Sequence, residues 1–115
     1  MPKPARALTL ILSAMPSEIR LIQAHLKKPR RGRLAGFPYV EGVLRGRRVV
    51  TTVTGVGVTN GAMVTALFVH HFQPAEVLVS GTGSRFNPRI NTGDTVISTR
   101  TIHHAAGSLT KDGMV

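Results

Sequence analysis

The sequence predicts an α/β fold, a three-layer α/β/α sandwich in which a mixed, mainly parallel sheet lies between helices. Two observations lead to this prediction. Short apolar runs with β-branched residues alternate along the chain with segments whose apolar residues recur at helical spacing. The apolar fraction, 42% of 115 residues, is enough for one hydrophobic core and one domain.

The first strand and the first helix are predicted at the start of the chain. Residues 7–14 form a continuous apolar run that is too short for a helix and is typical of a buried strand. A helix is expected to begin at residues 16–18, because proline is tolerated in a first turn and an acid is favoured there by the helix dipole. Apolar residues continue at helical spacing to Leu26, so the helix should end near residues 27–29.

A basic loop is predicted next, followed by a β-hairpin. The loop covers residues 27–33, where lysine and arginine dominate. Residues 39–44 and 48–54 have the composition of strands, and the turn residues 45–47 lie between them.

The second half of the chain predicts one more helix and two more strands. Glycines break the chain at residues 55–57, and a helix apolar on most faces should follow over residues 59–72 and be largely buried. Residues 76–80 predict a buried strand, residues 93–94 a turn and residues 95–102 a further strand. Because no helix pattern follows to cover that last strand, we expect the sheet to be incomplete at the C-terminus, with residues 1–115 forming the N-terminal portion of a single domain.

The formal net charge of +10 raises the question of a polyanionic partner. The excess is concentrated in residues 27–33 and 45–48, which flank turn residues and are not interleaved with aromatic side chains that could stack on bases. We therefore interpret both clusters as solvated, and nucleic acid is the less favoured partner.

Composition also limits the other classes of site. Without cysteine, the chain has no disulfide and no thiolate metal site. No segment reaches the roughly 18–20 apolar residues that cross a bilayer, so we expect no membrane partner and a cytoplasmic location. The pairs His70–His71 and His103–His104 lack the spacing that places two nitrogens on one metal, and we expect neither a metal nor another cofactor.

Three glycine-containing or small-residue loops follow predicted strands, at residues 14–18, 55–60 and 81–84. In open α/β sheets, ligands bind outside the carboxyl ends of the strands, so these loops are the candidate site. Glu18 is the only acid on them. It has two interpretations, a first-turn acid that stabilises the helix or a general base. Asp94, in a Gly-Asp turn, is interpreted as structural.

Taken together, these segments resemble a known family. SAMPSEIRLI, TGVGVTNGAMVTALFV, VSGTG and TGDTVISTRTIHH occur in the order and spacing of the nucleoside phosphorylase superfamily. Within it, the chain looks most like the 5′-methylthioadenosine/S-adenosylhomocysteine nucleosidases. The resemblance covers residues 8–104, about the first half of that family's usual length.

The resemblance implies an enzyme that hydrolyses the N-glycosidic bond of such nucleosides and releases adenine. It implies that Glu18 positions and activates the attacking water and that Met15 packs against the ribose. The remaining implied substrate-binding residues belong to the glycine loops: Val56, Gly57, Thr82 and Gly83. Phosphorylases of the superfamily carry arginine at the position of Glu18, so the resemblance favours water over phosphate as the nucleophile.

Departures from the family leave other functions open. Gly83, Ser84 and Arg85 stand where Ala-Gly-Gly is usual, and the later segments that hold the ribose hydroxyls and protonate the purine are absent. We therefore expect the 115-residue chain alone to have little or no turnover. The alternatives are a non-catalytic nucleoside-binding or interaction domain and, less favoured, a basic nucleic-acid binder. In its full-length form the family implies a homodimer.

Overall fold

The computed structural model describes residues 7–103, 107 and 109–114. The chain divides into two compact units, residues 1–83 and residues 84–115. The first unit contains one sheet and both helices, and the second contains a long irregular segment and a two-stranded sheet.

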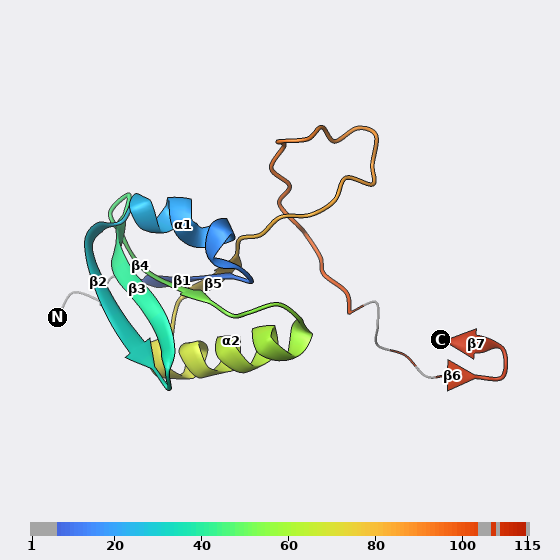
Figure 1. Ribbon diagram of the computed structural model, residues 1–115, viewed down its shortest axis with the longest axis horizontal. Helices are drawn as coiled ribbons and strands as arrows, with labels where there is room; N and C mark the ends of the chain where they lie inside the picture. The colour runs from blue at the N-terminus through green and yellow to red at the C-terminus, as the bar shows by residue number, and fades with distance from the viewer. Residues whose placement is uncertain (1–6, 104–106, 108, 115) are drawn as a thin grey trace. The chain divides into compact units, whose positions relative to one another are not determined.

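The first unit is built on a five-stranded mixed sheet (Figure 1). Central strand β1 pairs in parallel with its two neighbours, β4 and β5, while the β2–β3 and β3–β4 pairs are antiparallel. In spatial order the strands are β2 (Lys27–Leu34), β3 (Phe37–Leu44), β4 (Arg47–Val53), β1 (Leu8–Ser13) and β5 (Glu76–Val79). The predicted mixed sheet and the predicted hairpin are confirmed.

Two helices cover opposite faces of this sheet, α1 (Pro16–Ala24) and α2 (Val58–Phe72) (Figure 1). Because side chains alternate along a strand, Leu10 of β1 packs with Phe68 of α2, while its neighbour Ile11 packs with Ile19 of α1. Complete burial of a side chain such as Phe68 contributes roughly 1.5–3 kcal/mol. The three-layer α/β prediction is confirmed.

The basic segment is a strand, and the predicted loop over residues 27–33 is wrong. Its backbone pairs with β3 through a tight turn in which Ala35 and Gly36 have φ of 49° and 85°. Main-chain pairing of this kind does not require apolar side chains, so a basic segment can form an edge strand. Gly32 is needed in it because a Cβ there would collide with the ring of Tyr39.

Two elements are less buried than the sequence predicts. In α2 only Val64 and Phe68 are buried, and Met63 remains 50% exposed. Strand β5 was expected in the interior, yet all four of its residues are exposed, with Val79 at 80%. The physical reason for β5 is its position at the sheet edge, where β1 is its one partner strand within the described residues.

The second unit differs most from the sequence prediction. Residues 95–102 form no strand, because no other described segment pairs with their backbone, and Ile97 is 88% exposed. The short strands β6 (Leu109–Thr110) and β7 (Gly113–Met114) pair with each other instead. Asp94 closes a turn by accepting the backbone N–H of Asn91 at 2.8 Å, in agreement with its structural interpretation. His104 lies outside the described residues.

Among the described residues, neither helix has the length and apolar character needed to span a bilayer.

Candidate functional site

The candidate site lies at the carboxyl ends of three adjacent parallel strands. Because β4, β1 and β5 run in the same direction and are neighbours, the loops that follow them leave the same edge of the sheet. Backbone hydrogen bonds continue the pairing into these loops: Thr54 N–H donates to the carbonyl of Ser13 at 2.8 Å, and Ser80 N–H donates to that of Leu12 at 2.9 Å. The three loops singled out in the sequence therefore begin side by side.

Glu18 lies in the first turn of α1, and its carboxylate bends back toward the end of β1. Its Oε2 accepts the backbone N–H groups of Ala14 and Met15, each at 3.1 Å. These amides precede the helix and lack intrahelical partners, so the side chain caps the helix as the sequence suggested.

Thr82, from the loop after β5, holds the other carboxylate oxygen. Its backbone N–H and its hydroxyl donate to Oε1 of Glu18 at 3.1 and 2.9 Å. The backbone of Gly81 passes close by, since a Cβ there would lie 3.6 Å from the same oxygen. Glu18 is thus bound to two of the three loops.

The four donors fill the acceptor capacity of the carboxylate, about four lone-pair positions in all. The Thr82 hydroxyl is the main cause that lowers the pKa of Glu18; partial desolvation opposes it, and the three backbone N–H groups add to the lowering. Within the described chain no lysine, arginine or histidine forms an ion pair with Glu18. Its negative charge is stabilised by neutral groups alone.

The other predicted site residues lie on the same loops without bonding to Glu18 through their side chains. Met15, whose amide caps Glu18, has an exposed side chain. Val56 is also exposed, and Gly57 has φ of 100° where α2 begins, a conformation that favours glycine. Gly83 follows Thr82 at the exposed end of its loop.

Sequence reasoning missed three contributors to the geometry. The amides of Ala14 and Met15 could have been found from the capping pattern, in which a third-position glutamate reaches back to the residues before the helix. Asn60, whose amide donates to the carbonyl of Val56 at 2.8 Å, fixes the second loop. The bond between Thr82 and Glu18 spans 64 residues and has no local signal.

No group of three or more His, Asp or Glu side chains within the described residues could hold a metal ion.

Comparison with known proteins shows the family. A family model of the phosphorylase superfamily matches residues 9–113. The chain belongs to the phosphorylase superfamily. A 5′-methylthioadenosine/S-adenosylhomocysteine nucleosidase from Bacillus cytotoxicus is 33% identical to it over 94 residues, which are 82% of this chain and 41% of that protein.

Solved structures of the superfamily share the fold. The nucleosidase of Colwellia psychrerythraea, solved in complex with adenine, has a TM-score of 0.73 at 27% identity over 78% of this chain and 37% of its own. The Streptococcus pneumoniae nucleosidase with a transition-state inhibitor has a TM-score of 0.61 at 28% identity, over 63% of this chain and 31% of its own. This chain therefore spans about two fifths of the length of the relatives it matches.

Proposed function

We propose that this chain carries the water-activating part of a nucleosidase site for 5′-methylthioadenosine or S-adenosylhomocysteine. The observation that supports this most is Glu18, a carboxylate held at the carboxyl end of β1 by neutral donors alone. The nucleosidases among the relatives supply the substrate class.

In the proposed reaction, the bond between the sugar C1′ and the purine nitrogen breaks while a water oxygen bonds to C1′. The sugar passes through an oxocarbenium-like state, and Glu18 accepts one proton from the water. The departing purine must gain a proton, and we assign that donor to no residue of this chain. Met15, Val56, Gly57 and Gly83 form the walls that face the sugar in this proposal.

Glu18 needs a free lone pair before it can accept that proton. Thr82 holds Oε1 through two hydrogen bonds, of which the hydroxyl bond breaks by rotation about a single bond. We infer that the hydroxyl of Thr82 turns toward the bound sugar and releases Oε1 to the water. Thr82 is then both a positioning residue for Glu18 and a ligand of the substrate.

Water rather than phosphate is the proposed nucleophile. A phosphate would meet the unpaired negative charge of Glu18, and Val79 in the preceding strand supplies no cation to offset it. Adenine release should proceed at the same rate with and without added phosphate. A rate that rises in proportion to phosphate would instead assign a phosphorylase.

The direct test is adenine release from 5′-methylthioadenosine by the gene product, followed by chromatography. Glu18→Gln preserves the size of the side chain but removes the base, and should lower the rate at least about 100-fold. Circular dichroism and thermal unfolding show whether the variant is folded. A folded Glu18→Gln variant with full activity would overturn the assignment.

We further propose that residues 1–115 form the N-terminal portion of one nucleosidase domain, with little or no turnover by themselves. The relatives' greater length supports this. Turnover by the isolated 115-residue chain at the rate of a longer gene product would contradict it. A cytoplasmic homodimer in methionine salvage is part of the same proposal, and gel filtration of the gene product tests the dimer.

A second function is a nucleoside-binding domain without catalysis. The filled acceptor positions of Glu18 favour it, because a carboxylate that keeps all four donors cannot take a proton. Calorimetry with 5′-methylthioadenosine distinguishes the two functions. Binding by the gene product with no adenine released supports the second.

A further inference from the structure

The basic strand β2 has no role in the proposed hydrolysis, yet it carries much of the chain's positive charge. Its pairing with β3 places successive side chains on opposite faces of the sheet. Arg30 is paired with Glu41, whereas Arg31 and Arg33 are paired with Val40 and Pro38. Arg30 therefore lies on one face of the sheet, and Arg31 and Arg33 lie on the other.

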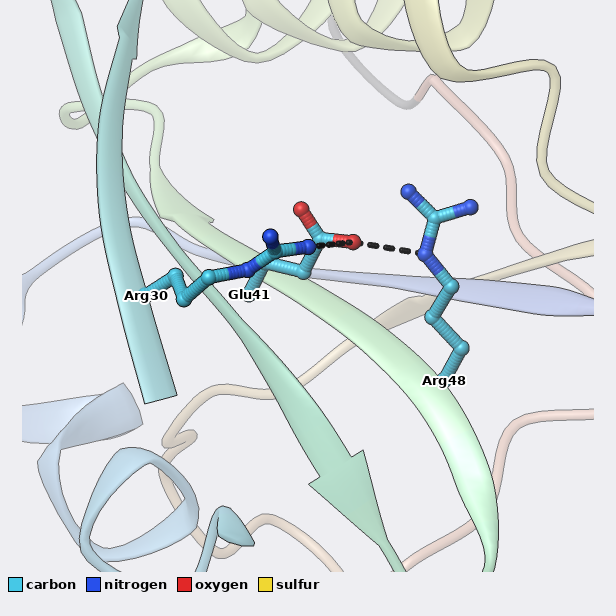
Figure 2. A network of polar contacts seen from close by, with 3 residues as sticks. All are labelled: Arg30, Glu41 and Arg48. Atoms are coloured by element: carbon cyan, nitrogen blue, oxygen red, sulfur yellow. Dashed lines mark hydrogen bonds and ion pairs between the residues drawn. The ribbon is translucent and has the colours of Figure 1, made fainter. Parts of the chain in front are cut away.

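On the face that carries Arg30, the guanidinium groups have a carboxylate between them. Figure 2 shows Arg30 and Arg48 on either side of Glu41, from three adjacent strands. The separations to its Oε1 are 3.9 Å from Arg30 and 2.6 Å from Arg48. On this face the carboxylate of Glu41 is therefore the counter-ion of both arginines.

The opposite face has a hollow in place of a counter-ion. Its volume is about 500 Å³, within the range of small-molecule sites. Val40 packs in the same cluster as Ile19, so this is the face covered by α1. The residues that line it include Gln23, Arg31, Arg33, Pro38, Val40 and Val53.

The two arginines beside this hollow have donors to spare. Arg33 donates once, to the carbonyl of Gly36 at 3.2 Å, and neither Arg31 nor Arg33 has an ion pair with any described carboxylate. Two residues apart on one strand, they project from the same face about 7 Å apart at the backbone. Guanidinium groups so placed can bind one oxyanion from two sides.

A fixed polar group from α1 also lines the hollow. The side-chain amide of Gln23 donates to the hydroxyl of Thr51 at 3.0 Å, and that hydroxyl donates to the carbonyl of Val40 at 3.1 Å. Thr51 is fully buried, so this chain of bonds sets the direction of the amide. The Gln23 carbonyl oxygen remains as an acceptor for a ligand.

We propose that this hollow binds a small organic anion. Arg31 and Arg33 hold its phosphate or carboxylate group, its apolar body lies on Val40 and Val53, and Gln23 accepts a hydrogen bond from it. The residues that line the hollow include neither Glu18 nor any of the groups that hold it. The proposed hydrolysis assigns no role to any of these residues.

Calorimetry with phenyl phosphate, benzoate and inorganic phosphate tests this proposal. Phenyl phosphate or benzoate should bind more tightly than inorganic phosphate, because only they have an apolar body. Whichever of phenyl phosphate and benzoate binds more tightly shows whether the hollow prefers a phosphate or a carboxylate group. Arg31→Ala should weaken that binding at least about tenfold, the size expected for one charge-assisted hydrogen bond.

Arg100→Ala is the matched control, since it removes the same charge from the second unit and should leave the affinity unchanged. Equal weakening by Arg31→Ala and Arg100→Ala would show unspecific attraction and overturn the proposal. Absence of binding by all three probes at millimolar concentration would overturn it as well. Because the nucleosidase assay is not involved, failure here leaves the proposed function standing.

Discussion

Glu18 and Glu41 are two of the five acidic residues in a basic chain, and their partners differ in kind. Glu41 lies between two guanidinium groups, in the middle of the antiparallel strands. Glu18 accepts hydrogen bonds from backbone amides and a hydroxyl at the end of a parallel strand. One carboxylate is neutralised by cations, and the other keeps an unpaired charge.

Under the proposed function, the difference leaves the general base of a strongly basic protein without a cation beside it. Cations near a general base stabilise its charge and weaken its tendency to take a proton. Neutral donors also lower the pKa, as the Thr82 hydroxyl does for Glu18, but a hydroxyl among them can turn away. The two sets of partners come from different parts of the fold: the arginines that pair with Glu41 lie on β2 and β4, whereas the donors to Glu18 lie on the loops after β1 and β5 and are neutral.

The largest effect should appear when Glu18 and Glu41 are replaced one at a time in the gene product and its hydrolysis of 5′-methylthioadenosine is measured. Glu18→Gln should lower the rate at least about 100-fold, whereas Glu41→Gln should change it less than about twofold. Glu76→Gln, at the amino end of β5, is a second control with the same loss of charge. A large loss in Glu41→Gln would mean that the two carboxylates are not distinct in function.

The second effect concerns pH. The Thr82 hydroxyl is the main cause that lowers the pKa of Glu18, so Thr82→Val should raise that pKa. A general base is lost as pH falls through its pKa, so the acid limb of the pH–rate profile should move to higher pH. Thr82→Ser keeps the hydroxyl and should leave the limb in place. An unmoved limb in the Thr82→Val variant would contradict the assigned role.

A third, smaller effect is that the two carboxylates should differ in how their contribution to the free energy of unfolding depends on salt. Glu41→Gln should lower the free energy of unfolding by about 1 kcal/mol at low ionic strength, and less at about 1 M salt, because its partners are charges. The cost of Glu18→Gln should depend little on salt, since its partners are neutral. Urea unfolding at both ionic strengths measures this. Equal salt dependence in the two variants would contradict the difference between charged partners for Glu41 and neutral partners for Glu18.

The smallest effect lies within the Glu41 network. Arg48 approaches Glu41 at 2.6 Å and Arg30 at 3.9 Å, with 80% of the Arg30 side chain exposed. Arg48→Ala should therefore cost about 0.5–1 kcal/mol of stability and Arg30→Ala only a few tenths. Thermal unfolding of the two variants gives the order. The reverse order would mean that the shorter contact contributes less stability than the longer one.

Periodicity in the sequence was sufficient for most elements of the first unit. The apolar run before Ser13 and the helical spacing after it gave β1 and α1, and the turn near Gly46 gave the β3–β4 hairpin. It failed for β2, whose lysines and arginines give no apolar pattern and whose strand forms only by pairing with β3. It also failed for residues 95–102, where an apolar pattern exists but no described strand pairs with it.

By itself, the sequence determined most of the apolar strands and helices of the first unit, which three loops follow strands, and that Glu18 is the one acid on those loops. These properties depend on neighbours within a few residues. Only the tertiary structure decided that Thr82 holds Glu18 and that Arg31 and Arg33 face a hollow while Arg30 and Arg48 share a carboxylate. Such partners are fixed by strand order and register, which bring together residues far apart in the sequence, such as Thr82 and Glu18 at 64 positions.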